Sequence, residues 1–157
     1  MRIRIASAVG SGPTTLAAFD AALHQAGIEN YNLIPLSSVI PTAAVLERTR
    51  ISTPPSEYGH RLYVVMARHM TSQVGEEAWA GLGWTQEPES GRGLFVELHG
   101  TSRRSVENAI ESTLDSMKAA RHYDYGKNES EIVGTVCEGE PVCALVIAVY
   151  ESEGWDA

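Results

Sequence analysis

One stretch of the chain changes character abruptly, from an apolar run to a pair of hydroxyl residues with a proline shortly beyond. It reads Asn30-Tyr31-Asn32-Leu33-Ile34-Pro35-Leu36-Ser37-Ser38-Val39-Ile40-Pro41. The apolar part is typical of a short buried strand. A strand that stops at Ser37-Ser38 places two small nucleophiles at a turn, where the backbone can hold an unusual conformation. Serine and proline are also common turn residues, so an ordinary strand end is the competing interpretation.

Upstream of this stretch, the pattern predicts a strand and then a helix. Residues 2–9 alternate charged and aliphatic side chains before turning small and apolar, which is typical of a strand. A glycine-rich turn over residues 10–13 follows, with Pro13 near the first helical position and without the lysine of a phosphate-binding loop. Gly27 fits the C-terminal cap of the helix. The expected apolar stripe consists of Leu16, Phe19, Leu23 and Ala26.

Downstream, the pattern predicts more strands than helices. We expect strands over residues 60–70 and 74–86, paired with each other, and over 93–99. In the first of these, Leu62, Val64 and Met66 would share a face. Two more strands, near 130–137 and 142–151, would be joined by a hairpin turn at Gly139 and so be paired with each other, ahead of a loose acidic tail over 151–157.

A second long helix is expected between these strands, capped by Thr101 or Ser102. Its buried face would consist of Val106, Ala109, Ile110, Thr113, Leu114, Met117 and Ala120. The whole pattern predicts one α+β domain over residues 1–157, with mostly antiparallel strands and two main helices. Two helices cannot cover both faces of so many strands, so we expect a second sheet or a partner subunit.

Composition narrows the classes of function. The chain has 157 residues, which suits one core, and carries 20 acidic against 12 basic side chains, a net charge of −8. This balance argues against a nucleic-acid or anionic membrane partner. The apolar runs are too short for a membrane span. The two cysteines, Cys137 and Cys143, could pair across strands, but we expect two reduced, half-buried thiols. Without neighbouring histidines they make a poor zinc site.

The ordered combination of several motifs resembles the pyruvoyl-dependent arginine decarboxylase family. The resemblance is dense over the first quarter of the chain and resumes around Gly93-Leu94-Phe95-Val96-Glu97. Its first part consists of Val9-Gly10-Ser11-Gly12-Pro13-Thr14, Ala18-Phe19-Asp20-Ala21-Ala22-Leu23, Ala26-Gly27-Ile28 and Asn32-Leu33-Ile34 before Ser37-Ser38-Val39-Ile40-Pro41. The resemblance implies a layered αββα sandwich that assembles as a homotrimer or a dimer of trimers.

The resemblance also implies that the chain cleaves itself between Ser37 and Ser38. The hydroxyl of Ser38 would attack the carbonyl of Ser37, and the resulting ester would eliminate and hydrolyse to a pyruvoyl group at position 38. The products would be a β chain of residues 1–37 and an α chain of residues 38–157. Asn32 matches the asparagine that would stabilise the oxyanion. Taken by itself, an asparagine there could equally cap a turn.

The implied reaction converts L-arginine to agmatine and carbon dioxide, a cytoplasmic step of polyamine biosynthesis, with the pyruvoyl group as electron sink. Glu97 matches the family's proton donor, although an outward strand position is its alternative. Asp20 matches the carboxylate for the guanidinium, although a solvated helix position would also suit it. Leu23 would pack on the aliphatic stem, and the new carboxylate of Ser37 would lie near the substrate. A neighbouring subunit would complete this pocket.

Some residues depart from the family pattern and keep other functions open. His99 stands where some relatives would carry a carboxylate or another polar residue, and Trp79 and Trp84 belong to no family motif. A pyruvoyl decarboxylase for another amino acid is one alternative, and a non-catalytic oligomeric binding protein of the same fold is another. No motif links any of the five histidines to Ser38, which disfavours a serine hydrolase.

Overall fold

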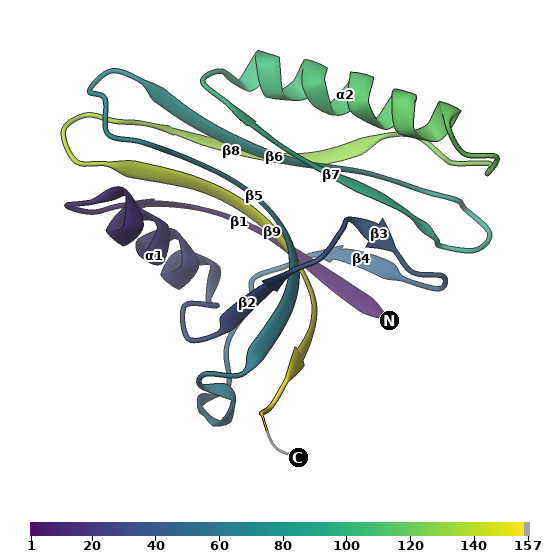
Figure 1. Ribbon diagram of the computed structural model, residues 1–157, viewed down its shortest axis with the longest axis horizontal. Coiled ribbons are helices and arrows are strands. Elements are labelled where there is room, and N and C mark those ends of the chain that lie inside the picture. Colours follow the sequence, from purple (N-terminus) through teal and green to yellow (C-terminus); the bar gives the residue numbers. More distant parts are fainter. Residues whose placement is uncertain (156–157) are drawn as a thin grey trace.

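Two β-sheets stack face to face, and each carries one helix on its outer face, so the molecule has four layers (Figure 1). This computed structural model describes residues 1–155. The first sheet has the strand order β2-β5-β9-β1-β4 and the second the order β3-β7-β6-β8. The strands are β1 (Arg2–Ser11), β2 (Asn32–Pro35), β3 (Val39–Ile40), β4 (Val45–Arg48), β5 (Arg61–Thr71), β6 (Glu77–Gln86), β7 (Gly93–Gly100), β8 (Glu129–Val136) and β9 (Val142–Glu153). The expected αββα sandwich is confirmed.

Two predicted strand pairings are wrong, because both turns cross between the sheets. β5 pairs with β2 and β9 in the first sheet, whereas β6 pairs with β7 and β8 in the second. The turn at Gly139 likewise leads from β8 in the second sheet to β9 in the first. Side-chain alternation shows which face of a strand is buried but does not show which strand lies beside it. The pairing is mostly antiparallel as predicted, with β1–β4 and β2–β5 parallel.

Helix α1 (Thr15–Ala26) lies unusually close to the first sheet because small residues form the contact. Thr14 caps its start, and Gly27, with φ 81°, caps its end as predicted. A side-chain carbon on Gly10 of β1 would overlap the backbone of the helix. The predicted apolar stripe is therefore partly wrong, since Leu16 is 74% exposed. The buried face is mainly alanine and consists of Ala18, Ala22, Leu23 and Ala26.

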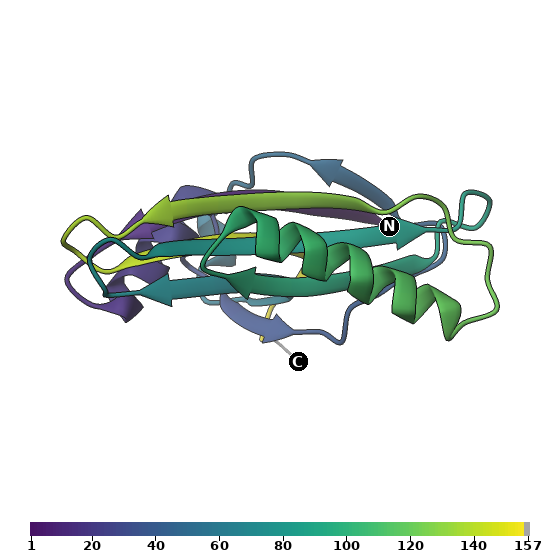
Figure 2. The same cartoon turned by 90° about the horizontal axis from the view of Figure 1, so that it is seen from above.

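Helix α2 (Arg103–Ala119) runs along the outer face of the second sheet (Figure 2). Ser102 caps its start, as one of the two expected residues. Val106, Ile110 and Leu114 are buried against the strands, whereas Ala120, predicted to be buried, is exposed at the end of the helix. Two glycines of β6, Gly81 and Gly83, lie directly beneath α2. The small residues in this strand therefore serve close packing.

The main core lies between the two sheets. It includes Phe95 and Trp84, whose rings meet edge to face at a centroid distance of 6.3 Å. Cys137 and Cys143 are both free, as predicted, and they are fully buried rather than half-buried. β9 continues to Glu153, so the expected loose tail is wrong for residues 151–153, while residues 156–157 lie outside the described part of the chain.

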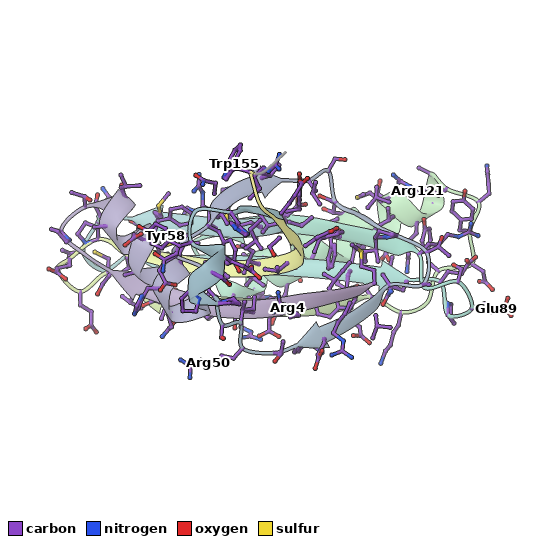
Figure 3. All side chains as sticks on the ribbon, turned by 90° about the horizontal axis from the view of Figure 1, so that it is seen from below. Arg4, Arg50, Tyr58, Glu89, Arg121 and Trp155 are labelled. Carbon is purple, nitrogen blue, oxygen red and sulfur yellow. The ribbon has the colours of Figure 1, made fainter. Side chains whose placement is uncertain are left out.

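One end of the molecule's long axis is formed by the turn between β6 and β7 together with the segment after α2. Figure 3 shows Glu89 and Arg121 together at that end. Arg92 lies with its guanidinium 3.8 Å from the centre of the Tyr123 ring, which joins the two segments. Among residues 1–155, no helix is long and apolar enough to cross a membrane.

Candidate active site

The Ser-Ser pair lies where the chain crosses from one sheet to the other. Leu36 still belongs to the first sheet, since its amide donates to the carbonyl of Val64. At the next positions the chain reaches the second sheet, where the amide of Phe95 donates to the carbonyl of Ser38 over 2.8 Å. Val39 and Ile40 then pair with β7 as strand β3. Ser37 and Ser38 are thus held between two short strands that anchor the chain on both sides.

Ser38 has a left-handed backbone, with φ 67°. Residues other than glycine adopt this conformation rarely, and it costs about 1–3 kcal/mol when the surrounding structure enforces it. The anchoring by β2 and β3 supplies that enforcement. The strain therefore falls on the residue whose preceding peptide bond is the predicted cleavage site.

The Ser38 side chain meets Glu97, the two residues that the family resemblance named as catalytic. The hydroxyl of Ser38 donates to Oε1 of Glu97 over 2.5 Å. Glu97 lies on β7 two residues beyond Phe95, which belongs to the core between the sheets, so its side chain points into the same interior. A carboxylate that accepts a hydrogen bond from a hydroxyl can also take its proton, which converts the oxygen into a stronger nucleophile.

Tyr150 also contributes to this site, although no pattern in the sequence predicted it. Its hydroxyl donates to the carbonyl of Val39 over 2.9 Å, directly after the reactive pair. Burial, and then the charge of Glu97, raise the pKa of the Tyr150 phenol. This phenol therefore remains a donor at neutral pH. The only signal in the sequence was an aromatic residue with a hydroxyl at the end of the aliphatic run 142–149.

The other predicted site residues lie elsewhere in the chain. Asp20 is exposed on α1, on the outer face of the first sheet, and Leu23 is buried beneath the same helix. The amide of Asn32 donates to the carbonyl of Gly59 over 2.7 Å, so within one chain it satisfies backbone at the start of β2. Ser37 is exposed. A single chain thus brings together Ser38 and Glu97 but leaves Asp20, Leu23 and Asn32 on other elements.

A second pair of residues joins the two sheets, with His69 half-buried and His99 exposed. His69 on β5 and His99 on β7 stack across the two sheets, with ring centroids 5.1 Å apart and planes 13° apart. His99 follows Glu97 by two residues and shares its face of the strand. Burial, and then the nearby His99, lower the pKa of His69, whereas Glu76 acts in the opposite direction. The unusual residue at position 99 therefore has a structural partner on the opposite sheet.

Comparison with known proteins agrees with this geometry and first indicates a class, the pyruvoyl-dependent enzymes. The family model described as pyruvoyl-dependent arginine decarboxylase matches residues 2–154. The chain therefore belongs to the pyruvoyl-dependent arginine decarboxylase family. The family resemblance read from the motifs is confirmed, and its cofactor is a pyruvoyl group.

Individual relatives support the same family. The pyruvoyl-dependent arginine decarboxylase of Halobacterium salinarum (strain R1) is 39% identical over 153 residues, which cover 95% of this chain and 93% of that protein. The protein of the same name from Thermococcus kodakarensis is 28% identical and covers 94% of this chain and 93% of its own length. Among solved structures, a pyruvoyl-dependent histidine decarboxylase at pH 8 aligns with a TM-score of 0.47 and 13% identity, over 88% of this chain and 62% of that one.

Proposed function

We propose that the chain cleaves itself between Ser37 and Ser38 and then decarboxylates L-arginine to agmatine and carbon dioxide, supplying polyamine biosynthesis. The observation that carries this proposal is the strained Ser38, whose hydroxyl lies 2.5 Å from the Glu97 carboxylate. A reactive oxygen, a proton acceptor and a constrained backbone are the requirements of the cleavage reaction. Membership of a pyruvoyl-dependent family supports the same conclusion.

In the proposed cleavage, Glu97 accepts the hydroxyl proton of Ser38 as the oxygen attacks the carbonyl carbon of Ser37. The peptide bond breaks, an ester forms, and the amine of residue 38 becomes free. Loss of the α proton of residue 38 expels the carboxylate of Ser37 and leaves a dehydroalanine. Water then replaces its nitrogen, which departs as ammonia, and a pyruvoyl group remains at position 38. The products are fragments 1–37 and 38–157.

The residues around position 38 suit the group that this reaction leaves. The site is half-buried between the sheets, and Glu97 and Tyr150 both supply protons or hydrogen bonds beside it. A pyruvoyl group supplies an electron sink that no side chain offers. Glu97 then delivers a proton to the substrate carbon that has lost its carboxylate, as a general acid on the same strand face.

Asp20 and Asn32 would act on the site of a neighbouring copy in an oligomer, a trimer or a dimer of trimers. The support is their location, since both are exposed in one chain and neither is joined to Ser38. Two exposed apolar side chains favour contact with another chain: Leu16, on the same helix as Asp20, is 74% exposed, and Val39, next to Ser38, is 58% exposed. Asp20 would accept paired hydrogen bonds from the guanidinium, Leu23 would border the pocket, and the carboxylate of Ser37 would lie near the substrate. The buried free cysteines support a reducing compartment such as the cytoplasm.

An intact-mass measurement of the purified protein tests the cleavage directly. We expect two fragments, with the larger one blocked at its amino terminus and reactive toward carbonyl reagents. The Ser38→Ala variant should remain a single chain without activity, whereas Ser37→Ala should still cleave, because position 37 supplies only its carbonyl. Fresh, active protein that retains one uncut chain would overturn the proposal.

Mixing two inactive variants tests the shared site. Asp20→Asn keeps the cleavage machinery but lacks the guanidinium carboxylate, and Ser38→Ala keeps Asp20 but cannot form the pyruvoyl group. Co-expression should restore decarboxylation if Asp20 acts on a neighbouring chain, because mixed oligomers contain complete sites. If oligomers that mass measurement shows to be mixed remain inactive, Asp20 does not act on the site of a neighbouring chain.

A further inference from the structure

An irregularity in β9 redirects two side chains beside the reactive serine. β5 and β9 pair in regular register up to Val64 opposite Val149, and then Tyr63 faces Glu151. Tyr150 is therefore an extra residue on β9, which defines a β-bulge. Bulges change the direction of the side chains around them and are frequent next to active sites. Here Tyr150 and Glu151, although adjacent in sequence, both line one pocket of about 390 Å³.

This pocket adjoins the candidate active site. Leu36 forms part of its lining and precedes Ser38 by two residues, at most about 7 Å along the chain. Tyr150 also lines the pocket, and its hydroxyl donates to the carbonyl of Val39. The remaining lining residues are Met1, Tyr63, Glu151 and Glu153. A ligand attached at position 38 can therefore extend into this space within the same chain.

The chemistry of the pocket suits an organic cation. Two tyrosine rings offer faces on which a guanidinium can lie, and Leu36 offers an apolar wall for a methylene stem. Glu153 is already engaged, because it accepts from the Tyr63 hydroxyl over 2.5 Å and pairs with Arg61 at 3.3 Å. Within residues 1–155, Glu151 has no hydrogen bond from its side chain and no ion pair. The pocket thus presents one available carboxylate. The amino terminus of Met1, which also lines the pocket, donates to the carbonyl of Ala43, and Arg61 is paired with Glu153.

We infer that this pocket binds the guanidinium end of the substrate and that Glu151 is the carboxylate that recognises it. The inference rests on the proposed decarboxylation, and it adds a specificity residue from the chain that carries Ser38. Asp20, in contrast, would approach from another copy. A guanidinium has five N–H donors, so one carboxylate does not exhaust its hydrogen-bonding capacity. Glu151 acts on affinity and selectivity, while the proton transfers remain with Glu97.

Steady-state kinetics of Glu151→Gln with two substrates test the inference. L-Citrulline has the shape of arginine but a neutral urea in place of the guanidinium. We expect the KM for arginine to rise roughly 10- to 100-fold in the variant, the usual effect of losing one charge-assisted hydrogen bond. The kcat should change little, and the preference for arginine over citrulline should fall by a similar factor. Glu151→Asp should recover part of the affinity.

Glu138→Gln is the matched control, since it removes the same charge from an exposed position in the turn between β8 and β9. It should leave KM and the arginine preference unchanged. Equal effects of the two variants, or an unchanged preference in Glu151→Gln, would overturn the inference. Intact mass keeps this result separate from the proposed function, because both variants should be fully cleaved.

If the wild-type protein neither cleaves nor releases carbon dioxide, the pocket can still be tested by itself. Calorimetry with agmatine, which carries the same guanidinium, then replaces the kinetics. Wild-type protein should bind agmatine more tightly than Glu151→Gln, and Glu138→Gln should match the wild type. Equal affinities in all three proteins would reject the cation site.

Discussion

Ser38 and Glu97 are separated by 59 residues in the sequence and come from different strands, yet the serine hydroxyl donates to the Glu97 carboxylate over 2.5 Å. The contact forms because β3 pairs with the first residues of β7 and thereby fixes Ser38 beside that strand. Glu97 then faces the interior between the sheets on the same side as Phe95. In the proposed reactions, the same carboxylate would take the proton of the Ser38 hydroxyl and, after cleavage, would act on the substrate.

This contact predicts that Glu97→Gln slows two reactions at once. The amide keeps the shape of the side chain but cannot take the Ser38 proton, and it cannot protonate the substrate carbon. General acid–base catalysis contributes about 10²- to 10⁴-fold, so cleavage and kcat should each fall within that range. Time courses of intact mass and carbon dioxide release measure the two rates separately. Glu89→Gln, an exposed change in a distant turn, should alter neither.

The Tyr150 hydroxyl should stabilise the segment that follows the reactive pair. Tyr150→Phe removes the donor to the carbonyl of Val39 and leaves the ring and its edge-to-face contact with Phe95 in place. The free energy of unfolding should fall by about 0.5–1.5 kcal/mol, the net value of one hydrogen bond. Urea unfolding of Ser38→Ala and of Ser38→Ala combined with Tyr150→Phe measures this in uncut protein. An unchanged unfolding midpoint would show that the bond contributes nothing.

Close packing of α2 predicts a sharp difference between two glycines. A side-chain carbon on Gly83 would overlap a methyl group of Ile110, whereas one on Gly139 would meet nothing within 4 Å. Gly83→Ala should lower the free energy of unfolding by about 1–3 kcal/mol, the usual cost of overpacking a core. Gly139→Ala should stay within about 0.5 kcal/mol of the wild type. Thermal or urea unfolding distinguishes them, and equal stabilities would contradict the packing of α2.

The stacked histidines predict that stability depends on pH on the acid side. The folded state lowers the pKa of His69 from its ordinary 6.5, first through burial and then through the charge of His99. Below pH 6.5 the unfolded chain therefore binds more protons than the folded chain, so stability falls as the pH decreases toward the lowered value. Above pH 6.5 His69 is neutral in both states, so its effect on the free energy of unfolding no longer changes with pH.

Unfolding midpoints at neutral pH and at about pH 5 measure this effect, since histidine titrates between them. His69→Asn should flatten the dependence relative to the wild type, because it removes the group whose pKa differs between the two states. His122→Asn, a change at an exposed histidine, should keep the wild-type slope. Identical slopes in all three proteins would show that the stacked pair does not titrate as described.

Local patterns predicted most of the elements because the signals for helices and strands are short in range. Gly27 ends α1 through its left-handed backbone, and Ser102 begins α2 because its hydroxyl accepts a hydrogen bond from the amide of Ser105. The strands β1, β5, β7 and β9 were all expected close to where they lie. The two-residue strand β3 and the short β4 were missed, because so few residues cannot establish a period.

Pairing and packing decided the rest. Alternation could show that β5 and β6 are strands but not that they lie in different sheets. Helical spacing could not show that the buried face of α1 consists mainly of alanines and leaves Leu16 exposed. The sequence by itself determined the family and named Ser38 and Glu97 as candidate site residues, because these depend on residue types in a linear order. Only the tertiary structure decided that Glu97 reaches Ser38, that Asp20 lies apart from both in one chain, and that a bulge at Tyr150 interrupts the pairing of β9 with β5. Those relations arise from contacts between residues distant in sequence, which no local pattern encodes.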